Sequence, residues 1–265
     1  INTLKSKFKE ATFFYLSAHE NHFNTTLKDF NSKIETLNLD IKYFGFRWWH
    51  LLSSKKKNIH KFDLIIDFQS KIRNTLILKT IPHRFFISSC FNFKLSKPKI
   101  KVKKMNKVND SILQAINLAL GIDLKLEEFD INKIDNKYFV ESEKLLPNDN
   151  YVGFSITQGN VYRKKQWPLK NIISICNKIK KYNKTPVFFI EKKDTELKEK
   201  IQKLIPFSIF PEHETNLSSP ALVTCLGKKL DFAITIDNGI MHMLSLSKVP
   251  MISLFGPTDS KKFAP

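Results

Sequence analysis

Short apolar runs alternate with amphipathic stretches along most of the chain. The runs are bounded by polar or turn-forming residues, which is typical of buried strands. The stretches between them repeat their apolar residues at helical spacing. The sequence predicts strands over Ala11–Ser17, Phe62–Phe68, Arg84–Ser88, Tyr151–Thr157, Pro186–Ile190, Phe207–Phe210 and Asp231–Ile236, with one more ending before Gly256. It predicts helices over Lys71–Thr80, Val108–Leu120, Leu169–Tyr182, Thr195–Leu204, Ser219–Lys229 and Ile240–Ser247.

This alternation indicates an α/β fold. Strands that are apolar throughout, separated by amphipathic helices, are typical of parallel sheets covered on both faces. The polar segment Leu145–Asn150 has the composition of a linker, so we expect two domains, residues 1–148 and 149–265. Ligands of such sheets bind beyond the carboxyl ends of the strands. The residues expected on this rim of the second domain are Thr157, Glu191, Asp237 and Gly256.

The sequence Asp237-Asn238-Gly239, followed by His242, joins a predicted strand to a predicted helix. Asn-Gly permits a tight turn, and a helix that begins there directs unbonded backbone N–H groups outward. Together with the positive end of the helix dipole, these groups form a site for a phosphate or another anion. His242 lies about one turn into the helix. Two structural alternatives stay open: Asp237 only caps the helix, and His242 only completes a hydrogen bond at the helix start.

Composition narrows the class of protein. With 265 residues, 42% of them hydrophobic and 12% aromatic, the chain has enough apolar residues for substantial cores, which argues against disorder. The sequence has no run of about eighteen apolar residues and no signal-peptide pattern, so we expect a cytoplasmic protein. Cys90, Cys176 and Cys225 lie far apart in the sequence, which favours neither a disulfide framework nor a zinc site.

The chain carries 44 basic and 25 acidic residues, a formal net charge of +19. Lysine is spread over most of the length beside abundant Asn, Ile and Phe, a bias that AT-rich codons alone would produce. Two denser groups, Lys55–Lys57 and the lysines from Lys94 to Lys107, are candidates for contact with an anionic surface. Solvated loops are the first interpretation, and a membrane or anionic-glycolipid surface is the second. We do not expect a nucleic-acid partner, because no recognition motif or interleaved aromatic residue accompanies the lysines.

Three motifs resemble those of one enzyme family. They are K-Q-W-P at residues 165–168, D-N-G-x-x-H at 237–242 and V-P-M-I-S-L-F-G-P-T at 249–258, and in this order they resemble glycosyltransferase family 9, the heptosyltransferases. The sequence of residues 62–74 is similar to a strand and helix of the family's N-terminal domain. The resemblance implies a GT-B architecture, in which two Rossmann-like domains with parallel sheets face each other across a cleft. The acceptor docks on the N-terminal domain and the nucleotide sugar on the C-terminal domain.

The resemblance also implies an activity. Family members move a heptose from ADP-heptose to the lipopolysaccharide core, with inversion and without a catalytic metal or another cofactor. The implied partners are an ADP-heptose-like donor and an anionic glycolipid acceptor, with peripheral contact at the cytoplasmic face of the inner membrane of a bacterium. Another sugar-nucleotide enzyme of the same architecture, such as an epimerase or a non-heptose transferase, stays open. So does a non-catalytic module that binds a nucleotide sugar.

Roles for individual residues come from the same resemblance. Lys165 is expected to stabilise negative charge on the leaving diphosphate, although beside Arg163 and Lys164 it could equally be a solvated loop lysine. Trp167 is expected to anchor this loop by packing. The donor-binding residues are expected to be Thr157, Asp237, Asn238, Gly239, His242, Gly256 and Thr258.

Other polar residues keep two interpretations each. Asp194 is expected either near the nucleoside or at an exposed helix start. Asp67 and Gln69 either reach toward the acceptor or are structural.

The sequence departs from the family pattern in several respects. Asn238 stands where the family usually has Ser or Thr, so a hydroxyl contact is lost and the identity of the donor stays open. In the family, the general base lies on a loop after the first strand, and this sequence begins beyond that point, with Ala11–Ser17 corresponding to the second strand. The sequence also ends before the family's last helices. We therefore expect a fragment of an active enzyme, with the base supplied by a preceding segment.

Overall fold

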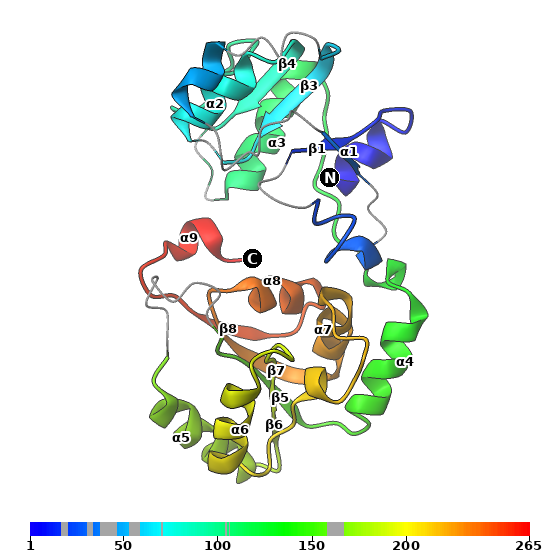
Figure 1. Ribbon diagram of the computed structural model, residues 1–265, viewed down its shortest axis with the longest axis vertical. Coiled ribbons are helices and arrows are strands. Elements are labelled where there is room, and N and C mark those ends of the chain that lie inside the picture. Colours follow the sequence, from blue (N-terminus) through cyan, green and yellow to red (C-terminus); the bar gives the residue numbers. More distant parts are fainter. Residues whose placement is uncertain are drawn as a thin grey trace. The chain divides into compact units, whose positions relative to one another are not determined.

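The computed structural model divides into two compact units, each described here by itself (Figure 1). Unit 1 comprises Ile1–Thr25 and Ser32–Glu128, and unit 2 comprises Thr26–Asn31 and Phe129–Pro265. The structure describes residues 1–16, 21–30, 34–37, 47–52, 59–69, 71–103, 105, 107–157 and 167–265. No helix in this described part of the chain is long and apolar enough to cross a bilayer.

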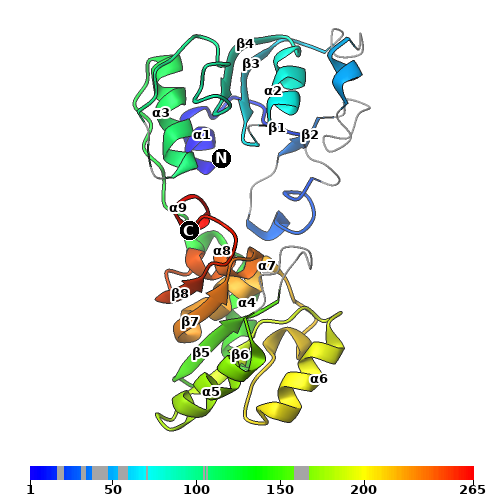
Figure 2. The ribbon, with the colours of Figure 1, turned by 90° about the vertical axis from the view of Figure 1, so that its left-hand side faces the viewer.

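Unit 1 is built on the parallel pair β3 (Phe62–Asp67) and β4 (His83–Ser88). Helix α2 (Ile72–Lys79) connects these strands, and α3 (Val108–Leu120) covers the opposite face of the pair, as Figure 2 shows. A smaller parallel pair, β1 (Phe14–Tyr15) with β2 (Glu35–Thr36), the short helix α1 (Asn2–Lys7) and a 3₁₀ helix at Trp48–Leu52 complete the described elements of this unit. The strand predicted over Ala11–Ser17 is thus only two residues long, and Ser17 lies outside the described residues.

Each face of the β3–β4 pair has its own core. Ile77, Leu78 and Phe86 lie in the core on the α2 side, and Ile112 and Ile116 lie in the core on the α3 side. This arrangement explains why both strands are apolar throughout, since each is covered on two faces.

A buried carboxylate ties the carboxyl ends of the two strands together. Oδ2 of Asp67 accepts hydrogen bonds from the hydroxyls of Thr75 (2.5 Å) and Ser88 (2.9 Å), and Oδ1 accepts one from the backbone amide of Gln69 (3.0 Å). Asp67 is only 1% exposed. These contacts support the structural interpretation of Asp67, because a buried carboxylate requires such donors.

Unit 2 contains a four-stranded parallel sheet with the order β6-β5-β7-β8. The strands are β5 (Tyr151–Ser155), β6 (Thr185–Phe188), β7 (Leu230–Ile236) and β8 (Met251–Leu254). The helices are α4 (Asn136–Leu145), α5 (Leu169–Lys180), α6 (Thr195–Leu204), α7 (Pro220–Leu226), α8 (Gly239–Leu246) and α9 (Ser260–Phe263).

Two apolar cores cover this sheet, one on each face. Helices α5 and α6 pack over Phe154 and Phe188, whose rings stack with centroids 5.1 Å apart. Helices α4, α7 and α8 pack over Tyr151, Val187 and Ala233. The connections therefore alternate strands with covering helices, as the sequence pattern predicts.

Helix α4 has no predicted counterpart, and it explains where the two units divide. It packs against α7, so residues from Phe129 onward belong to unit 2. The units divide between residues 128 and 129. The boundary expected from the sequence lies twenty residues later, between residues 148 and 149. The polar segment Leu145–Asn150 leads from α4 into β5 within one unit.

Two predicted secondary-structure elements need correction. The strand predicted over Phe207–Phe210 is wrong, because only one bridge, from Ile209 to Val187, forms there. Pro206 and Pro211 flank this stretch and cannot donate to a sheet, which limits the pairing. The helix predicted over Ser219–Lys229 is in fact α7 followed by a 3₁₀ turn at Gly227–Lys229, with Ser219 as its N-cap.

Candidate functional site

The carboxyl ends of the strands of unit 2 meet at one edge of the sheet, because all four strands are parallel. Ser155 ends β5, Asp237 follows β7 and Phe255 follows β8. The pairing of Ser155 with Thr235 and of Ile236 with Leu254 fixes these ends beside one another. This edge is where a ligand of a parallel α/β sheet is expected.

Asn238 connects three elements at this edge. Its Oδ1 accepts a hydrogen bond from the amide of Met241 (3.0 Å), which makes Asn238 the N-cap of α8. Its Nδ2 donates to Oγ of Ser155 (2.7 Å) and to the backbone carbonyl of Thr157 (2.8 Å). The side-chain amide of Asn238 is therefore fully used in holding β5, β7 and α8 together, and its two N–H groups are already engaged.

The backbone at Asn238 differs from the tight turn expected of Asn-Gly. Its φ is −151° and its ψ −178°, which is extended, and neither Asn238 nor Gly239 has a positive φ. The extended conformation is the usual one for an N-cap residue. Asn238, rather than Asp237, thus caps the helix, and asparagine serves this role as well as the serine or threonine that it replaces.

Asp237 is joined to the loop that follows β8. Its Oδ2 accepts a 2.6 Å hydrogen bond from the hydroxyl of Thr258, and its backbone amide donates to the carbonyl of Leu254 (3.2 Å). The Asp237 residue is 9% exposed. Thr258 thus lies at the predicted rim beside Asp237. Gly256 lies in the same loop, and apart from its chain neighbours a Cβ added there would meet none of the described residues within 4 Å.

The first turn of α8 provides the electrostatics expected of an anion site. Met241 is capped by Asn238, whereas the amides of Gly239 and Ile240 precede the first acceptors within the helix. Apart from its chain neighbours and its own helix, a Cβ added at Gly239 would meet none of the described residues within 4 Å, so these residues leave space over this turn. Amides in this position, together with the helix dipole, favour a phosphate.

His242 lies on α8 one turn further on, and its side chain reaches solvent. Partial desolvation lowers the pKa of His242 below its ordinary value of 6.5, and the negative charge of Asp237 opposes this effect. The imidazole is therefore neutral near pH 7. Approach of an anion such as a diphosphate would favour the protonated form, which adds a charged donor beside the α8 amides.

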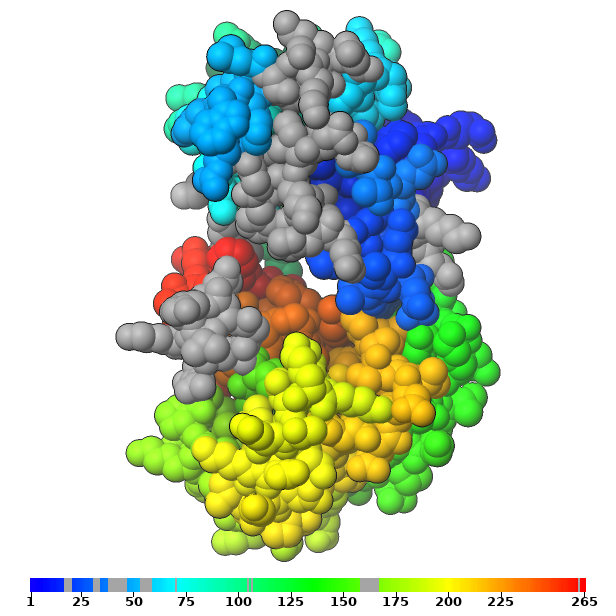
Figure 3. Space-filling model, in the orientation of Figure 1, coloured from blue at the N-terminus to red at the C-terminus, as the bar shows by residue number. Residues whose placement is uncertain are grey.

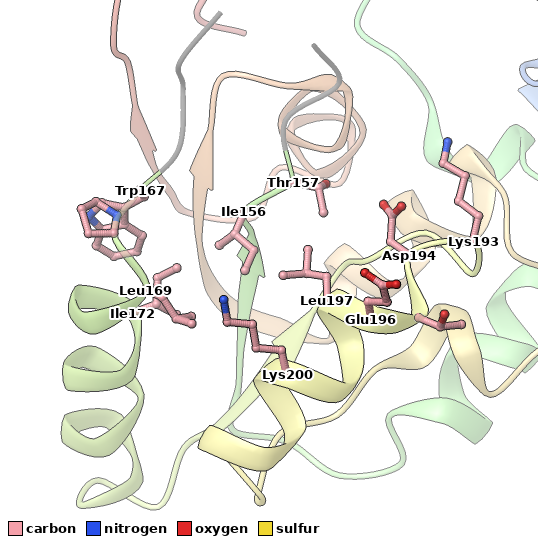
Figure 4. A pocket seen from close by; sticks show the side chains of 12 residues that line it. Ile156, Thr157, Trp167, Leu169, Ile172, Lys193, Asp194, Glu196, Leu197 and Lys200 are labelled. Atoms are coloured by element: carbon pink, nitrogen blue, oxygen red, sulfur yellow. The ribbon is translucent and has the colours of Figure 1, made fainter. Parts of the chain in front are cut away.

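A cavity of about 670 Å³ opens on the other side of β5, between the N-terminal ends of α5 and α6. Figure 4 shows Lys200 extending from α6 toward α5, and the carboxylates of Asp194 and Glu196 at the start of the same helix. Figure 3 shows α6, in yellow, at the surface of unit 2. Thr157 and Trp167 also line the cavity. These two residues border the undescribed segment 158–166 in the sequence.

The predicted site residues thus fall into three groups. Asp237, Asn238, Thr157 and Thr258 are connected by hydrogen bonds at the rim, Thr157 through its carbonyl. Gly239 and His242 follow on α8, and Gly256 stands in the loop that Thr258 ties to Asp237. Lys165 lies outside the described residues, so its predicted role remains a prediction.

Sequence reasoning missed one polar cluster near this edge. Glu212, which is 4% exposed, accepts a hydrogen bond from Ser218 (3.0 Å), while its Oε1 has no hydrogen-bond partner among the described residues. Burial raises the pKa of Glu212, and the nearby charge of Glu191 raises it further. The sequence Pro-Glu-His resembles an ordinary surface loop, so no signal in the sequence indicates this burial.

The family model of glycosyltransferase family 9 (heptosyltransferase) matches residues 53–265. No curated protein sequence matches the chain. Among solved structures, the glycosyl transferase family 9 protein from Veillonella parvula has a TM-score of 0.63 at 16% identity, covering 100% of this chain and 78% of that one.

Two Escherichia coli structures are also similar to this chain in fold. Heptosyltransferase WaaC with ADP-2-deoxy-2-fluoro heptose has a TM-score of 0.63 at 12% identity, covering 100% of this chain and 86% of that one. ADP-heptose lps heptosyltransferase II has a TM-score of 0.60 at 16% identity, covering 100% of this chain and 81% of that one. These likenesses confirm the expected fold class, an α/β fold with parallel sheets that matches GT-B heptosyltransferases. Together with the match over residues 53–265, they show that the chain belongs to glycosyltransferase family 9 and is a glycosyltransferase.

Proposed function

We propose that the protein transfers a heptose from an ADP-heptose-like donor to the core of lipopolysaccharide or to a similar glycolipid. The family match supports this proposal, as do the fold likenesses to WaaC with ADP-2-deoxy-2-fluoro heptose and to ADP-heptose lps heptosyltransferase II. The observation that carries it is the strand end at Asp237, where Asn238 caps α8 and the amides of Gly239 and Ile240 begin the helix.

The diphosphate of the donor binds at the first turn of α8 in this proposal. The amides of Gly239 and Ile240 donate to its oxygens, and His242 donates from one turn further along the helix. Asp237 repels phosphate oxygens, so its carboxylate accepts a hydroxyl of the donor instead, in an orientation held by Thr258. Thr157 contributes from the end of β5, where the Asn238 side chain holds its backbone.

The chemistry is a single displacement at the anomeric carbon. An acceptor hydroxyl forms the new C–O bond while the bond from that carbon to the diphosphate breaks, which inverts the configuration and releases ADP. The departing diphosphate gains negative charge, which the α8 amides and Lys165 stabilise. The proton of the acceptor hydroxyl passes to a general base that is not assigned to any residue of this chain. We propose that this transfer requires no metal ion.

The two substrates suggest where the enzyme works. A nucleotide sugar is water-soluble, whereas a lipopolysaccharide acceptor is anchored by its acyl chains. The reaction therefore takes place at a lipid surface, and we place it at the cytoplasmic face of the inner membrane.

A transfer assay with several donors tests the function. The enzyme is incubated with a lipopolysaccharide-core acceptor and with ADP-heptose, ADP-glucose or UDP-glucose, and the products are identified by mass spectrometry. We expect heptose transfer from ADP-heptose, inverted at the anomeric carbon by NMR, and unchanged rates in EDTA. Epimerised ADP-heptose without a transfer product, or equal transfer from UDP-glucose, would contradict the proposal.

A further inference from the structure

A short segment of unit 1 presents its lysines to solvent in a regular way. Ile100 and Val102 pack against the core on the α3 side of the β3–β4 pair, the side shown with α3 in Figure 2. The lysines on either side of them are exposed, and this alternation has the period of two that an extended chain gives. We call these residues the lysine row: Lys97, Lys99, Lys101 and Lys103.

Backbone hydrogen bonds hold the lysine row at both ends. The amide and carbonyl of Lys97 exchange hydrogen bonds of 2.8 and 2.9 Å with the carbonyl and amide of Phe86 in β4. At the other end, the amide of Lys103 donates to Oε1 of Gln114 on α3 (2.9 Å). The segment is thus part of the folded unit, and its lysine side chains lie outside it.

The charge of the lysine row is not neutralised by the described residues. None of the ion pairs among them includes a lysine of the row, whereas Lys184 and Lys229 elsewhere pair with Asp231 and Glu143 at 2.7 and 2.8 Å. Like charges held in one short segment produce a positive potential that attracts an anionic surface. The net charge of +19 on the whole chain also favours binding to an anionic surface.

We propose that the lysine row docks the enzyme on the anionic surface of a lipid bilayer. Lysine ammonium groups are compact, hydrated point charges, which suit a surface of many head groups, and each adds to the attraction within a Debye length of the bilayer. Single-stranded nucleic acid is a poorer match, because Ile100 and Val102 face inward and no ring in the row offers stacking to a base. The preference for a lipid surface rests on the proposed glycolipid acceptor.

Vesicle co-sedimentation of the full chain tests this docking. We expect binding to vesicles of phosphatidylcholine with phosphatidylglycerol, little binding to phosphatidylcholine alone, and loss of binding as salt is raised. The double variant Lys99→Glu with Lys101→Glu should weaken binding by about tenfold or more, since each lysine near the surface contributes and is here reversed. The matched control, Lys178→Glu with Lys181→Glu at the end of α5, changes the formal charge equally and should stay within about twofold of the wild type.

Several outcomes would overturn the docking. Equal losses in the two double variants would mean that only net charge matters, and equal binding to both kinds of vesicle would exclude electrostatic docking. Tighter binding to DNA than to vesicles at the same salt, lost in the Lys99 and Lys101 variant, would identify nucleic acid as the partner. Circular dichroism checks folding, and Lys99→Gln with Lys101→Gln should weaken binding less than charge reversal does.

A soluble acceptor without acyl chains separates this inference from the proposed function. With that acceptor, the Lys99 and Lys101 variant should transfer heptose at the wild-type rate, because no membrane is involved. A slower rate would show that the row acts on catalysis instead of docking. If the wild type transfers no heptose to any acceptor, the proposed function fails, while the vesicle assay still decides the role of the row.

Discussion

The hydroxyl of Thr258 donates a 2.6 Å hydrogen bond to Oδ2 of Asp237, across the ends of β8 and β7. Asp237 is 9% exposed, so its carboxylate has limited access to water and depends on protein donors. This bond links the loop after β8 to Asp237, the residue that precedes the N-cap of α8. The orientation of the carboxylate at the proposed donor site is therefore set by a residue in the loop that follows a different strand, β8.

Replacing Thr258 by valine tests whether the Asp237 carboxylate depends on the Thr258 hydroxyl as a hydrogen-bond donor. Thr258→Val keeps the shape of the side chain but leaves the carboxylate without that donor, which should lower the unfolding free energy by about 1.5–3 kcal/mol. Urea denaturation measures the change, and Thr258→Ser should restore most of the loss because serine keeps the hydroxyl. A valine variant as stable as the wild type would show that the bond contributes nothing.

The cap of α8 can be tested against another cap in the same unit. Asn238→Ala should lower the unfolding free energy by at least about 1 kcal/mol and also weaken ADP binding, because it disturbs the helix end that meets the phosphates. Asp135 caps α4 by accepting from the amide of Lys137 (3.0 Å), and Asp135→Ala should affect stability alone. Equal effects of the two variants on ADP affinity, measured by calorimetry, would refute a donor site at α8.

The affinity for ADP should depend on pH through His242. The free imidazole has a lowered pKa and is neutral at pH 7. A bound diphosphate favours the protonated form, so the pKa of His242 is higher in the complex, and affinity rises as pH falls from that pKa toward the lowered pKa of the free protein. ADP itself titrates in this range, so calorimetry from pH 7.5 to 5.5 must compare the wild type with His242→Asn. Identical pH dependence in both proteins would remove His242 from the site.

Lys165 should matter more for turnover than for substrate binding, since charge on the leaving diphosphate grows in the transition state. Lys165→Ala should lower kcat by about 100-fold, in the range found when one electrostatic donor is removed. Lys164→Ala is the matched control, because it removes the lysine that precedes Lys165 in the sequence. Steady-state kinetics showing equal effects of the two changes would contradict the role proposed for Lys165.

Much of the architecture follows from local patterns. The helix predicted over Thr195–Leu204 agrees with α6, and the helix predicted over Val108–Leu120 agrees with α3. Apolar runs such as Tyr151–Ser155 are buried on both faces, so hydrophobicity alone identifies them. Helix α4 was missed because its stability depends on packing against α7, which is distant in the sequence.

Only part of the candidate site could be predicted from the sequence. The sequence Asp237-Asn238-Gly239 predicted a helix start correctly, although Asn238 and not Asp237 is the N-cap and its backbone is extended. The bonds from Asn238 to Ser155 and Thr157 could not be predicted, since they join residues more than eighty positions apart. The burial of Glu212 is likewise a tertiary effect within a segment of polar appearance.

The most direct test of the account is ADP binding to the variant Gly239→Ala. Apart from its chain neighbours and its own helix, a Cβ at this position meets none of the described residues within 4 Å, so the thermal midpoint should not fall. The same methyl group stands at the first residue of α8, where it obstructs close approach of a phosphate to the backbone. Calorimetry should show ADP affinity reduced by about tenfold or more, a cost near 1.4 kcal/mol. An affinity equal to that of the wild type would contradict the assignment of the donor diphosphate to this helix start.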